Sequence, residues 1–302
     1  MMQDNISWLC EMPFCAMSSF ELQCEFGKPA VTKNDYVNNN FLENIKSLYH
    51  DNIFNNLNFN YYTVDALNAI TANENSIKFS LFHMNIRSLN KNNEELFQFL
   101  STISLDFDVL VLSEIWSYNI TLYRNLIPGY AFYYDLPVES NVGGIGVYVK
   151  DKLSHCIVDN YKISGVDDCR MENLWIEVTK GQIRYIVGGI YRHPGYKINK
   201  FSAKLGEVLT QIHNSKVPCL IAGDINIDLK RFQTQQGTKA YLDSLILNNL
   251  MPVVLMPSRI SEKSANLLII VIILVIANEL THFCVAANAA VSVHWIFNPL
   301  TT

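Results

Sequence analysis

Apolar and polar positions follow a regular pattern from about residue 77 onward. Residues 77–85 alternate apolar with polar side chains, which predicts a strand that runs into a polar turn at Asn85. Residues 94–105 then place apolar side chains at spacings of three and four, which predicts an amphipathic helix with Asn92 or Asn93 as its cap. A strand followed by a helix of this kind is typical of mixed α/β domains.

Further strand patterns follow this helix. Residues 108–114 are almost continuously apolar up to Glu114, which favours a central strand covered on both faces. A lone glutamate at such a position is usually a solvated end residue, so Glu114 is a candidate functional residue only in combination with the other motifs. Later strands are predicted at 142–149, which is glycine-hinged, at 174–178 and at 183–194, the last of which ends in Tyr191, Arg192 and His193.

Residues 217–228 contain the most informative stretch, V-P-C-L-I-A-G-D-I-N-I-D. Residues 219–222 read as a buried strand, and Gly223 is expected to let the backbone turn so that Asp224 and Asn226 emerge at its end. Side chains two apart on an extended chain point the same way, and a carboxylate with an amide suits a phosphate or a hard cation such as Mg²⁺. The alternative is an Asx-rich turn after a core strand.

Two further helices are expected, one on each side of this stretch. Their apolar positions are Phe201, Leu205, Leu209 and Ile212 for the first, and Tyr241, Leu245 and Asn249 for the second. Residues 1–75 are rich in Asn and show no sustained period, so we expect a loosely ordered leader with one short helix at most. The alternative is a docking arm that uses exposed Phe and Tyr as anchors.

Composition limits the possible functions. The chain has 302 residues, of which 49% are hydrophobic, and this is ample for a globular core. Its net charge of -5 argues against a protein that coats nucleic acid by bulk electrostatics, although an acidic metal site with local basic patches is compatible with it. Seven scattered cysteines without a C-x-x-C pair indicate a reduced compartment, and the start of the chain lacks the pattern of a signal peptide.

The run L-L-I-I-V-I-I-L-V-I-A at 267–277 raises the alternative of a membrane segment. It is well short of the roughly 20 residues that span a bilayer, and polar residues follow it directly. We therefore expect a very apolar core strand and no stable membrane span.

Five motifs together resemble a known family. The series N-I-R-S-L-N, L-S-E-I-W, G-G-I-G-V-Y-V, G-I-Y-R-H-P and G-D-I-N, in this order and spacing, is similar to the endonuclease domain of LINE-type (non-LTR) retrotransposons. That domain belongs to the endonuclease/exonuclease/phosphatase superfamily of apurinic endonucleases, DNase I and inositol phosphatases. The resemblance covers residues 77–260 and continues more weakly to about 297. It implies a four-layered α/β sandwich of two mainly antiparallel sheets with outer helices, placed at residues 76–297 behind the leader.

The resemblance also implies roles for individual residues. Glu114 would bind the divalent metal, Mg²⁺ or Mn²⁺, with Asn85 beside it as a metal or phosphate ligand. Tyr191 would donate a hydrogen bond to the scissile phosphate. Asp224 would orient or deprotonate the attacking water, and Asn226 would hold the phosphate. These roles suit phosphodiester hydrolysis, which needs a Lewis acid, a positioned water and donors on the non-bridging oxygens.

The C-terminal part departs from the family pattern. Where the family has S-A-T-L-I-D-H-I, this chain has S-A-N-L-L-I-I-V, which puts Ile269 in the position of an aspartate. In S-V-H, which replaces the family's S-D-H, Val293 takes the aspartate position and His294 that of the catalytic histidine. The alternative is that residues 266–302 derive from a frameshifted or spliced end. We expect a retained fold and metal site with impaired catalysis, because two aspartates are missing.

Three functional classes follow. The first is a Mg²⁺-dependent endonuclease that nicks DNA, the second a phosphatase or phosphodiesterase acting on a small phosphorylated molecule, and the third an inactive remnant or nucleic-acid-binding protein. Four basic side chains in residues 192–204 favour a nucleic-acid backbone, with Arg192 and Ser258 as candidate phosphate contacts. No reverse transcriptase pattern follows, an active enzyme is expected inside the cell and in the nucleus, and the sequence leaves the oligomeric state open.

Overall fold

The computed structural model describes residues 58–62, 64–71, 79–116, 120–138, 142–164, 170–254, 259–261, 264–266, 269–274, 283–289 and 292–297. Ser258 and the first 57 residues of the expected leader lie outside these ranges.

Two β-sheets form the centre of the molecule. The first sheet has the order β1-β15-β14-β2-β3-β5-β4, and the second has the order β10-β13-β9-β8-β7-β6. The strands of the first sheet are β1 (Asn58–Tyr62), β2 (Phe79–Asn85), β3 (Val109–Ser113), β4 (Tyr130–Asp135), β5 (Ile145–Lys150), β14 (Phe283–Ala289) and β15 (Ser292–Phe297). Those of the second are β6 (Ser154–Ile157), β7 (Met171–Lys180), β8 (Ile183–Arg192), β9 (Cys219–Asp224), β10 (Leu250–Pro252) and β13 (Ile269–Leu274). A separate pair joins β11 (Arg259–Ser261) to β12 (Ser264–Asn266).

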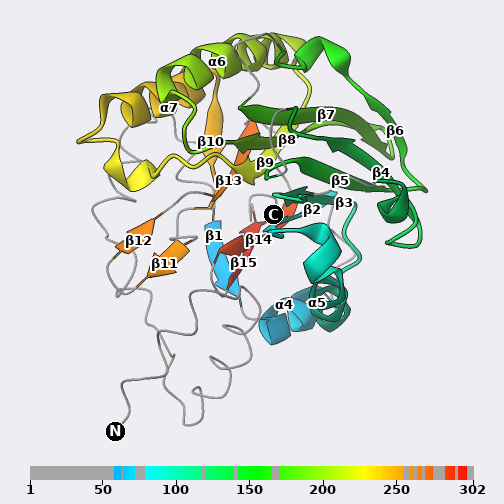
Figure 1. The fold of residues 1–302 in the computed structure, drawn as a ribbon. Helices are drawn as coiled ribbons and strands as arrows, with labels where there is room; N and C mark the ends of the chain where they lie inside the picture. Colours follow the sequence, from blue (N-terminus) through cyan, green and yellow to red (C-terminus); the bar gives the residue numbers. More distant parts are fainter. Residues whose placement is uncertain are drawn as a thin grey trace, which may run out of the picture.

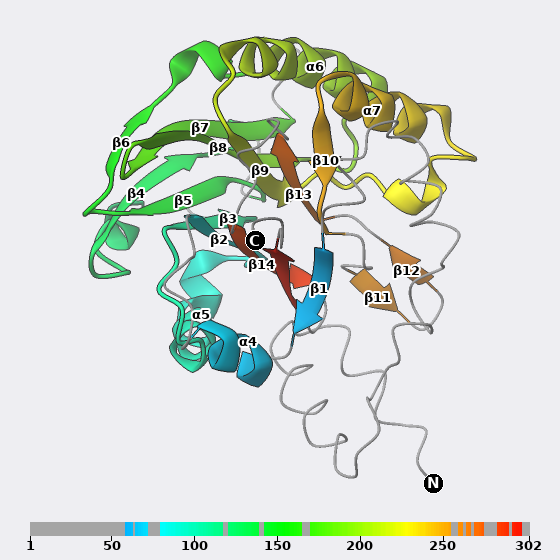
Figure 2. The same cartoon turned by 180° about the vertical axis from the view of Figure 1, so that it is seen from behind.

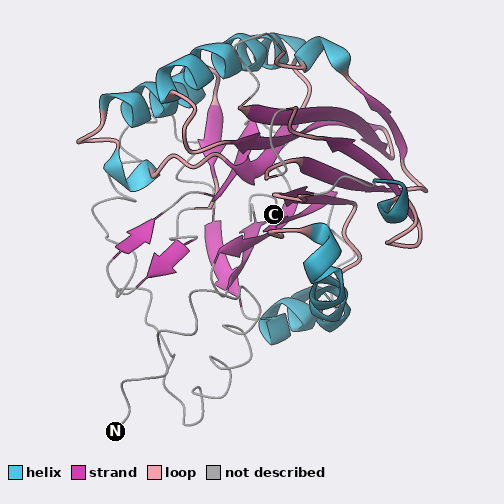
Figure 3. Ribbon diagram, viewed as in Figure 1, coloured by secondary structure: helices cyan, strands magenta, loops and turns pink. Residues whose placement is uncertain are grey.

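Helices cover the outer face of each sheet, as Figures 1 and 2 show from opposite sides. Helices α4 (Val64–Thr71) and α5 (Leu89–Thr102) lie under the first sheet, and α6 (Ile198–Ser215) and α7 (Gln236–Leu247) lie over the second. Short 3-10 turns occur at Ile120–Tyr123, Asp159–Tyr161 and Leu229–Arg231. The sequence of helix, sheet, sheet and helix layers is visible in Figure 3 and confirms the predicted four-layered α/β sandwich.

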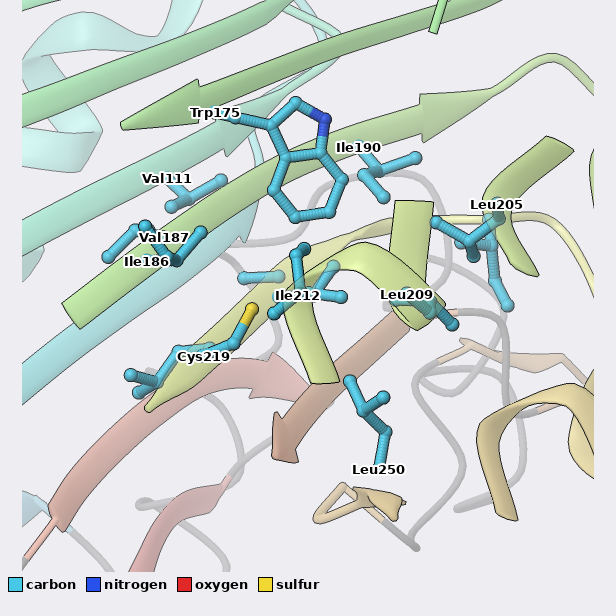
Figure 4. Packing of buried hydrophobic residues seen from close by; sticks show 14 of the residues in the cluster. Val111, Trp175, Ile186, Val187, Ile190, Leu205, Leu209, Ile212, Cys219 and Leu250 are labelled. Carbon is cyan, nitrogen blue, oxygen red and sulfur yellow. The ribbon is translucent and has the colours of Figure 1, made fainter. Parts of the chain in front are cut away.

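The main hydrophobic core lies between the two sheets and continues between the second sheet and α6. Leu205, Leu209 and Ile212 of α6 belong to the same buried cluster as Cys219 of β9, and of these three Ile212 lies next to Cys219 in Figure 4. Burial raises the pKa of the Cys219 thiol because the surroundings offer nothing to stabilise a thiolate. Helix α6 thus presents the apolar face that its spacing of three and four predicts.

Strand β2 is buried on both faces, which the alternation of its sequence does not predict. Phe79 and Leu81 face the second sheet, and Phe82 and Met84 belong to a second cluster that includes α5 residues. The polar residue His83 is also fully buried, and its pKa falls to about 3 because burial disfavours the charged ring. The central position of β2, between β14 and β3, explains this burial.

Strand β9 is longer than predicted, because the expected turn at Gly223 does not occur. The strand continues to Asp224, and Gly223 pairs within the β8–β9 ladder. A Cβ atom added at Gly223 would lie 1.7 Å from the main-chain oxygen of Ile190 on β8. The glycine therefore permits a close approach of two strands rather than a change of direction.

The ends of two helices also differ from expectation. Ser88 caps α5 by accepting from the main-chain N–H of Lys91. Asn92, a predicted cap, lies inside the helix, where its side chain donates to the carbonyls of Ile86 and Arg87. Helix α7 ends at Leu247, so Asn249 lies beyond it.

Residues 58–71, which we expected in the leader, belong to the sandwich. Strand β1 pairs antiparallel with β15, so this N-terminal segment forms an edge of the first sheet. Leu67 of α4 is fully buried in the cluster beneath that sheet. These elements lie before residue 76, where the sequence pattern placed the domain start.

The apolar run at 267–277 contains strand β13, which pairs antiparallel with β9. The expected strand is therefore present in this run. Among the helices that the structure describes, none combines the length and apolar character needed to cross a bilayer.

Candidate active site

The candidate site lies where one edge of each sheet meets the other. β2 and β3 run parallel in the first sheet, and β8 and β9 run parallel in the second, so each pair ends at a common edge. Asn85 ends β2 and Asp224 ends β9, while Glu114 directly follows β3. This topology brings together side chains that are far apart in the sequence.

The amide of Asn85 joins the two carboxylates. Its Nδ2 atom donates to Oε1 of Glu114 at 2.8 Å and to Oδ2 of Asp224 at 2.8 Å. The Oδ1 atom of Asn85 accepts from the main-chain N–H of Arg87 at 3.3 Å, which fixes the orientation of the amide. Three of the residues predicted for the site therefore form one hydrogen-bonded group that spans both sheets.

The site accumulates negative charge in a buried place. Asp224 is only 5% exposed, and its pKa rises to about 6, first because of burial and second because of the charge on Glu114. Hydrogen bonds from the Asn226 main chain and from Asn85, and the charge of Arg192, oppose this rise. Asp224 is therefore held near the point where it exchanges a proton at mildly acidic pH.

Tyr191 lies close to these carboxylates on β8. Its phenol is 3% exposed, and its pKa is raised by burial and then by the negative charges of Glu114, Asp224 and Glu172. The hydroxyl consequently remains protonated and serves as a hydrogen-bond donor. This is the state that a contact with a phosphate oxygen requires.

The oxygen atoms of this group suit a divalent cation. Among the described residues, no group of three or more His, Cys, Asp and Glu side chains is placed to hold a metal ion. The ligand atoms at this site are the carboxylate oxygens of Glu114 and Asp224 and Oδ1 of Asn85, because Nδ2 of Asn85 is a hydrogen donor. Mg²⁺ commonly takes one or two carboxylates and completes its shell with water and substrate phosphate. Burial, and after it the charge of Glu114, raises the pKa of Asp224, and a cation would counter both effects by favouring the ionised carboxylate. A cation bound here would meet Glu114, with Asn85 beside it.

Asn226 reaches the site in a way that differs from the predicted one. The chain is no longer extended beyond Asp224, and Asn226 adopts a left-handed backbone with φ of 50°. Its main-chain N–H donates to Oδ1 of Asp224 at 3.0 Å, and its side-chain Nδ2 donates to the carbonyl of Arg192 at 2.8 Å. Asn226 thus contacts Asp224 through its backbone, while its amide nitrogen ties the loop after β9 to β8.

Arg192 is buried and bonded to the protein itself. Its side chain donates to the carbonyls of Ile225 at 2.5 Å and Asn226 at 2.6 Å, and also to that of Tyr196. Burial lowers the pKa of this guanidinium from its ordinary value. Because only 2% of the residue is exposed, the geometry favours bracing of the surrounding loops over the expected contact with a nucleic-acid phosphate.

The C-terminal strands place the remaining predicted residues by register. Ile269 is the backbone partner of Asp224, so it lies at the edge that carries the site. His294 pairs with Val285, which pairs in turn with Leu81 of β2. Leu81 lies four residues before Asn85, which is about 13 Å along a strand. The structure therefore does not bring the backbone of His294 to the site edge, and Ser258 lies outside the described residues.

Glu172 was missed from the sequence, and its partner His193 was noted only as the end of a strand. Glu172 is 2% exposed and lies opposite Tyr191 in the β7–β8 register. Its Oε1 contacts Nε2 of His193 at 3.0 Å, and its Oε2 accepts from the N–H of Gly144 at 2.8 Å. The only signal was the acidic residue at the start of the apolar run M-E-N-L-W-I, which the periodicity treats as a strand end.

Comparisons with known proteins agree with this arrangement. The structure is similar to the endonuclease domain of TRAS1, a telomere-specific non-LTR retrotransposon, with a TM-score of 0.54 and 11% identity over 72% of this chain and 95% of that one. It is also similar to the AP endonuclease LMAP from Leishmania major, with a TM-score of 0.51 and 12% identity over 72% of this chain and 87% of that one. At these identities the likeness shows the fold alone.

No curated protein matches the chain in sequence. The sequence profile of the Endonuclease/Exonuclease/phosphatase family, however, matches residues 70–272, which include Asn85, Glu114, Tyr191 and Asp224. The chain therefore belongs to the endonuclease/exonuclease/phosphatase family.

Proposed function

We propose that this protein is a divalent-metal-dependent endonuclease that nicks DNA and derives from a retrotransposon. The observation that carries the proposal is the single amide of Asn85 holding Glu114 and Asp224 together from two different sheets. Such a group has no evident packing purpose, because it gathers two carboxylates whose charges repel each other in a buried place. A bound cation would offset this repulsion.

The residues divide the chemistry of phosphodiester hydrolysis among them. Asp224 accepts the proton of the attacking water, and a pKa of about 6 keeps it ionised and basic at neutral pH. The hydroxyl of Tyr191 donates to a non-bridging oxygen as negative charge develops there. A Mg²⁺ or Mn²⁺ ion held by Glu114 with Asn85 would supply Lewis-acid stabilisation of that charge.

Nucleic acid is the favoured substrate because basic residues lie beside the site. Lys197, Lys200 and Lys204 are exposed around the start of α6, which follows the end of β8 after a short loop. Lysines in such a position attract a phosphate backbone, although the chain as a whole carries a charge of -5. The five motifs shared with retrotransposon endonucleases support DNA as the target and a retroelement as the origin.

Impaired activity is part of the proposal. Ile269 lies at the site edge, in the position where the family pattern has an aspartate. Val293 takes the position of the second family aspartate. An aspartate that holds a histidine fixes its tautomer, so the family histidine would lose its orientation here. The loss of one oriented electrostatic contributor typically lowers a rate by about 10² to 10³.

The test is a plasmid-nicking assay with Mg²⁺ and with EDTA. We expect slow conversion of supercoiled to open-circular DNA that requires the metal and disappears in Asp224→Asn, which preserves shape and removes the charge. Parallel assays with small phosphate monoesters measure the alternative activity. Metal-dependent release of inorganic phosphate without nicking would replace the proposal by a phosphatase, and metal-independent nicking that survives in Asp224→Asn would refute it.

A further inference from the structure

A histidine and a buried glutamate form a second polar group next to the phenol of Tyr191. Nε2 of His193 lies 3.0 Å from Oε1 of Glu172, and the glutamate side chain is 2% exposed, against 17% for the histidine. The ring of His193 packs edge-on against that of Tyr191, with centroids 4.9 Å apart and an angle of 73°. The pair therefore adjoins the proposed catalytic hydroxyl without being bonded to the metal-binding residues.

The surroundings hold this pair in one geometry. The second oxygen of Glu172 accepts from the N–H of Gly144 at 2.8 Å, and Gly143 and Gly144 both have positive φ. A Cβ atom at Gly143 would lie 2.7 Å from Oε2 of Glu172 and 2.9 Å from Nε2 of His193. The backbone of Gly143 therefore packs directly against the pair, and its carbonyl accepts from Trp116, two residues after Glu114.

The free ring nitrogen of His193 is available to a ligand. Because Nε2 faces a carboxylate, it carries the hydrogen, and Nδ1 is the atom left over. Within the described part of the chain, Nδ1 makes no hydrogen bond, whereas Nε2 and the main-chain N–H both do. A doubly protonated ring can thus donate from Nδ1 to an anion while Glu172 holds the other side.

We propose that His193, positioned by Glu172, binds a backbone phosphate of the nucleic acid next to the Tyr191 ring. The inference rests on the proposed function, since it names a further contact to the same substrate. Arg192 is buried and is unable to make the phosphate contact that the sequence predicts. The inference gives this contact to His193, the next residue in the chain. Glu172 acts only through His193 in this scheme and is a positioning residue.

The test measures how DNA binding depends on salt. Fluorescence anisotropy with a duplex of about 30 base pairs, at one fixed pH, gives the association constant over a series of NaCl concentrations. All variants are made in the Asp224→Asn background, so that Mg²⁺ can be present without cleavage. His193→Ala should lower affinity about tenfold and reduce the slope of log K against log salt by about 0.9, the value for one phosphate contact.

A matched control is available in His155. It is also half-buried, packs edge-on against Tyr133 at 5.5 Å, and bonds through Nδ1 to the carbonyl of Leu153. His155 pairs with Val178, six residues from Glu172 along β7 and so about 20 Å from the pair. His155→Ala should leave both affinity and salt slope unchanged.

Glu172→Gln separates the positioning role from a structural one. The glutamine keeps an oxygen for the N–H of Gly144 and removes the charge beside His193. We expect it to reduce the salt slope as well, and we expect the double variant with His193→Ala to bind no more weakly than His193→Ala alone. Additive losses would show that Glu172 supports the site through Gly144 and would overturn its assigned role.

The outcomes distinguish this inference from the proposed function. If the parent protein nicks DNA and its Asp224→Asn form binds DNA, while His193→Ala in that background keeps the salt slope, only the inference fails. A folded starting protein that neither nicks nor binds DNA overturns both. A smaller slope in His193→Ala, with no change in His155→Ala, supports the phosphate contact, because a purely structural role would not alter the number of ions released.

Discussion

Burial and the charge of Glu114 raise the pKa of Asp224 to about 6, and this one residue sets the expected pH dependence of the reaction. If Asp224 accepts the proton of water, the rate rises about tenfold per pH unit below its pKa and levels off above it. A nicking rate measured from about pH 4.5 to pH 8 at saturating metal checks this. A bound cation shifts the midpoint below 6 because it favours the carboxylate. A rate that falls across this range would rule out Asp224 as the base.

The same pKa has a consequence for stability without metal. The folded-state pKa lies above the ordinary value of 3.8, so protonation favours the folded state. This contribution is fully present below about pH 4 and is lost as the pH rises through 6. We expect Asp224→Asn in EDTA to raise the free energy of unfolding by about 1–2 kcal/mol at pH 7, after allowing for a weaker hydrogen bond from Asn85.

Urea unfolding of both proteins at about pH 4 and pH 7 measures this difference. At the lower pH the two should be nearly equal, because Asp224 is then protonated in the parent. Equal stability at both pH values would show that the carboxylate is not strained in the folded protein. Magnesium should stabilise both proteins, because Glu114 and Asn85, which would hold it, are unchanged in Asp224→Asn.

For single residues, the sequence predicts which residues form the site better than it predicts the hydrogen bonds between them. Asn85, Glu114, Tyr191 and Asp224 were predicted one by one, and the structure brings them together at one edge. Glu172 could not be predicted, because only its hydrogen-bond partners in the folded protein, His193 and Gly144, distinguish it from an ordinary acidic residue at a strand end. Those partners lie on other strands, and no local pattern encodes them.

Among the secondary-structure elements, β8 and β9 approach each other most closely at Gly223. A methyl group there would lie 1.7 Å from a main-chain oxygen, which no side-chain rotation can relieve. We expect Gly223→Ala to lower the free energy of unfolding by at least about 3 kcal/mol, or to prevent folding. Chemical denaturation monitored by circular dichroism measures the change.

Gly181→Ala is the control for this substitution. Gly181 connects β7 to β8 with φ of 63°, and a Cβ atom there meets nothing within 4 Å. Its substitution should cost only about 1 kcal/mol, from the left-handed backbone alone. Similar losses in the two variants would argue against the tight β8–β9 contact.

The elements that were predicted have the expected order and type, but their ends were less accurate, and β4 and β6 were not predicted. The apolar periods of β3, β7, β8, α6 and α7 are long enough to identify each element. The end of β9 was predicted too early because glycine after an apolar run is usually a turn signal, whereas Gly223 serves strand packing. Likewise, Asn92 or Asn93 was predicted as the cap of α5, whereas the helix begins earlier, at Leu89, and Ser88 caps it.

For the whole molecule, α4 decides where the domain begins. Leu67 is fully buried against the layer that contains α5, although it precedes the family-like motifs. We expect Leu67→Ala to lower the free energy of unfolding by about 2–5 kcal/mol, as for other core leucines. Leu122→Ala, at a residue that is 63% exposed, should change it by less than about 0.5 kcal/mol. An equally small effect at Leu67 would show that α4 is not part of the folded domain and belongs to the leader, as the sequence predicted.

The four layers followed from the order of strands and helices together with the family resemblance. The position of β1 could not be predicted, because Asn58–Tyr62 shows no apolar period and gains its place only by pairing with β15, more than 200 residues later in the sequence. The positions of β13 and β15 could not be predicted either, because they depend on strand pairing. Their register places Ile269 at the site edge and His294 away from it.

The three carbonyls that bind Arg192 come from two different loops, the one that follows β8 and the one that follows β9. A single planar group therefore crosslinks these loops, and the carbonyl of Arg192 itself is held by Asn226. Loops joined in this way open together, as one cooperative unit of native-state hydrogen exchange. Tyr191 and Asp224 would then keep or lose their alignment together. A local fluctuation would therefore disrupt the whole active site at once and would not displace one of its residues alone.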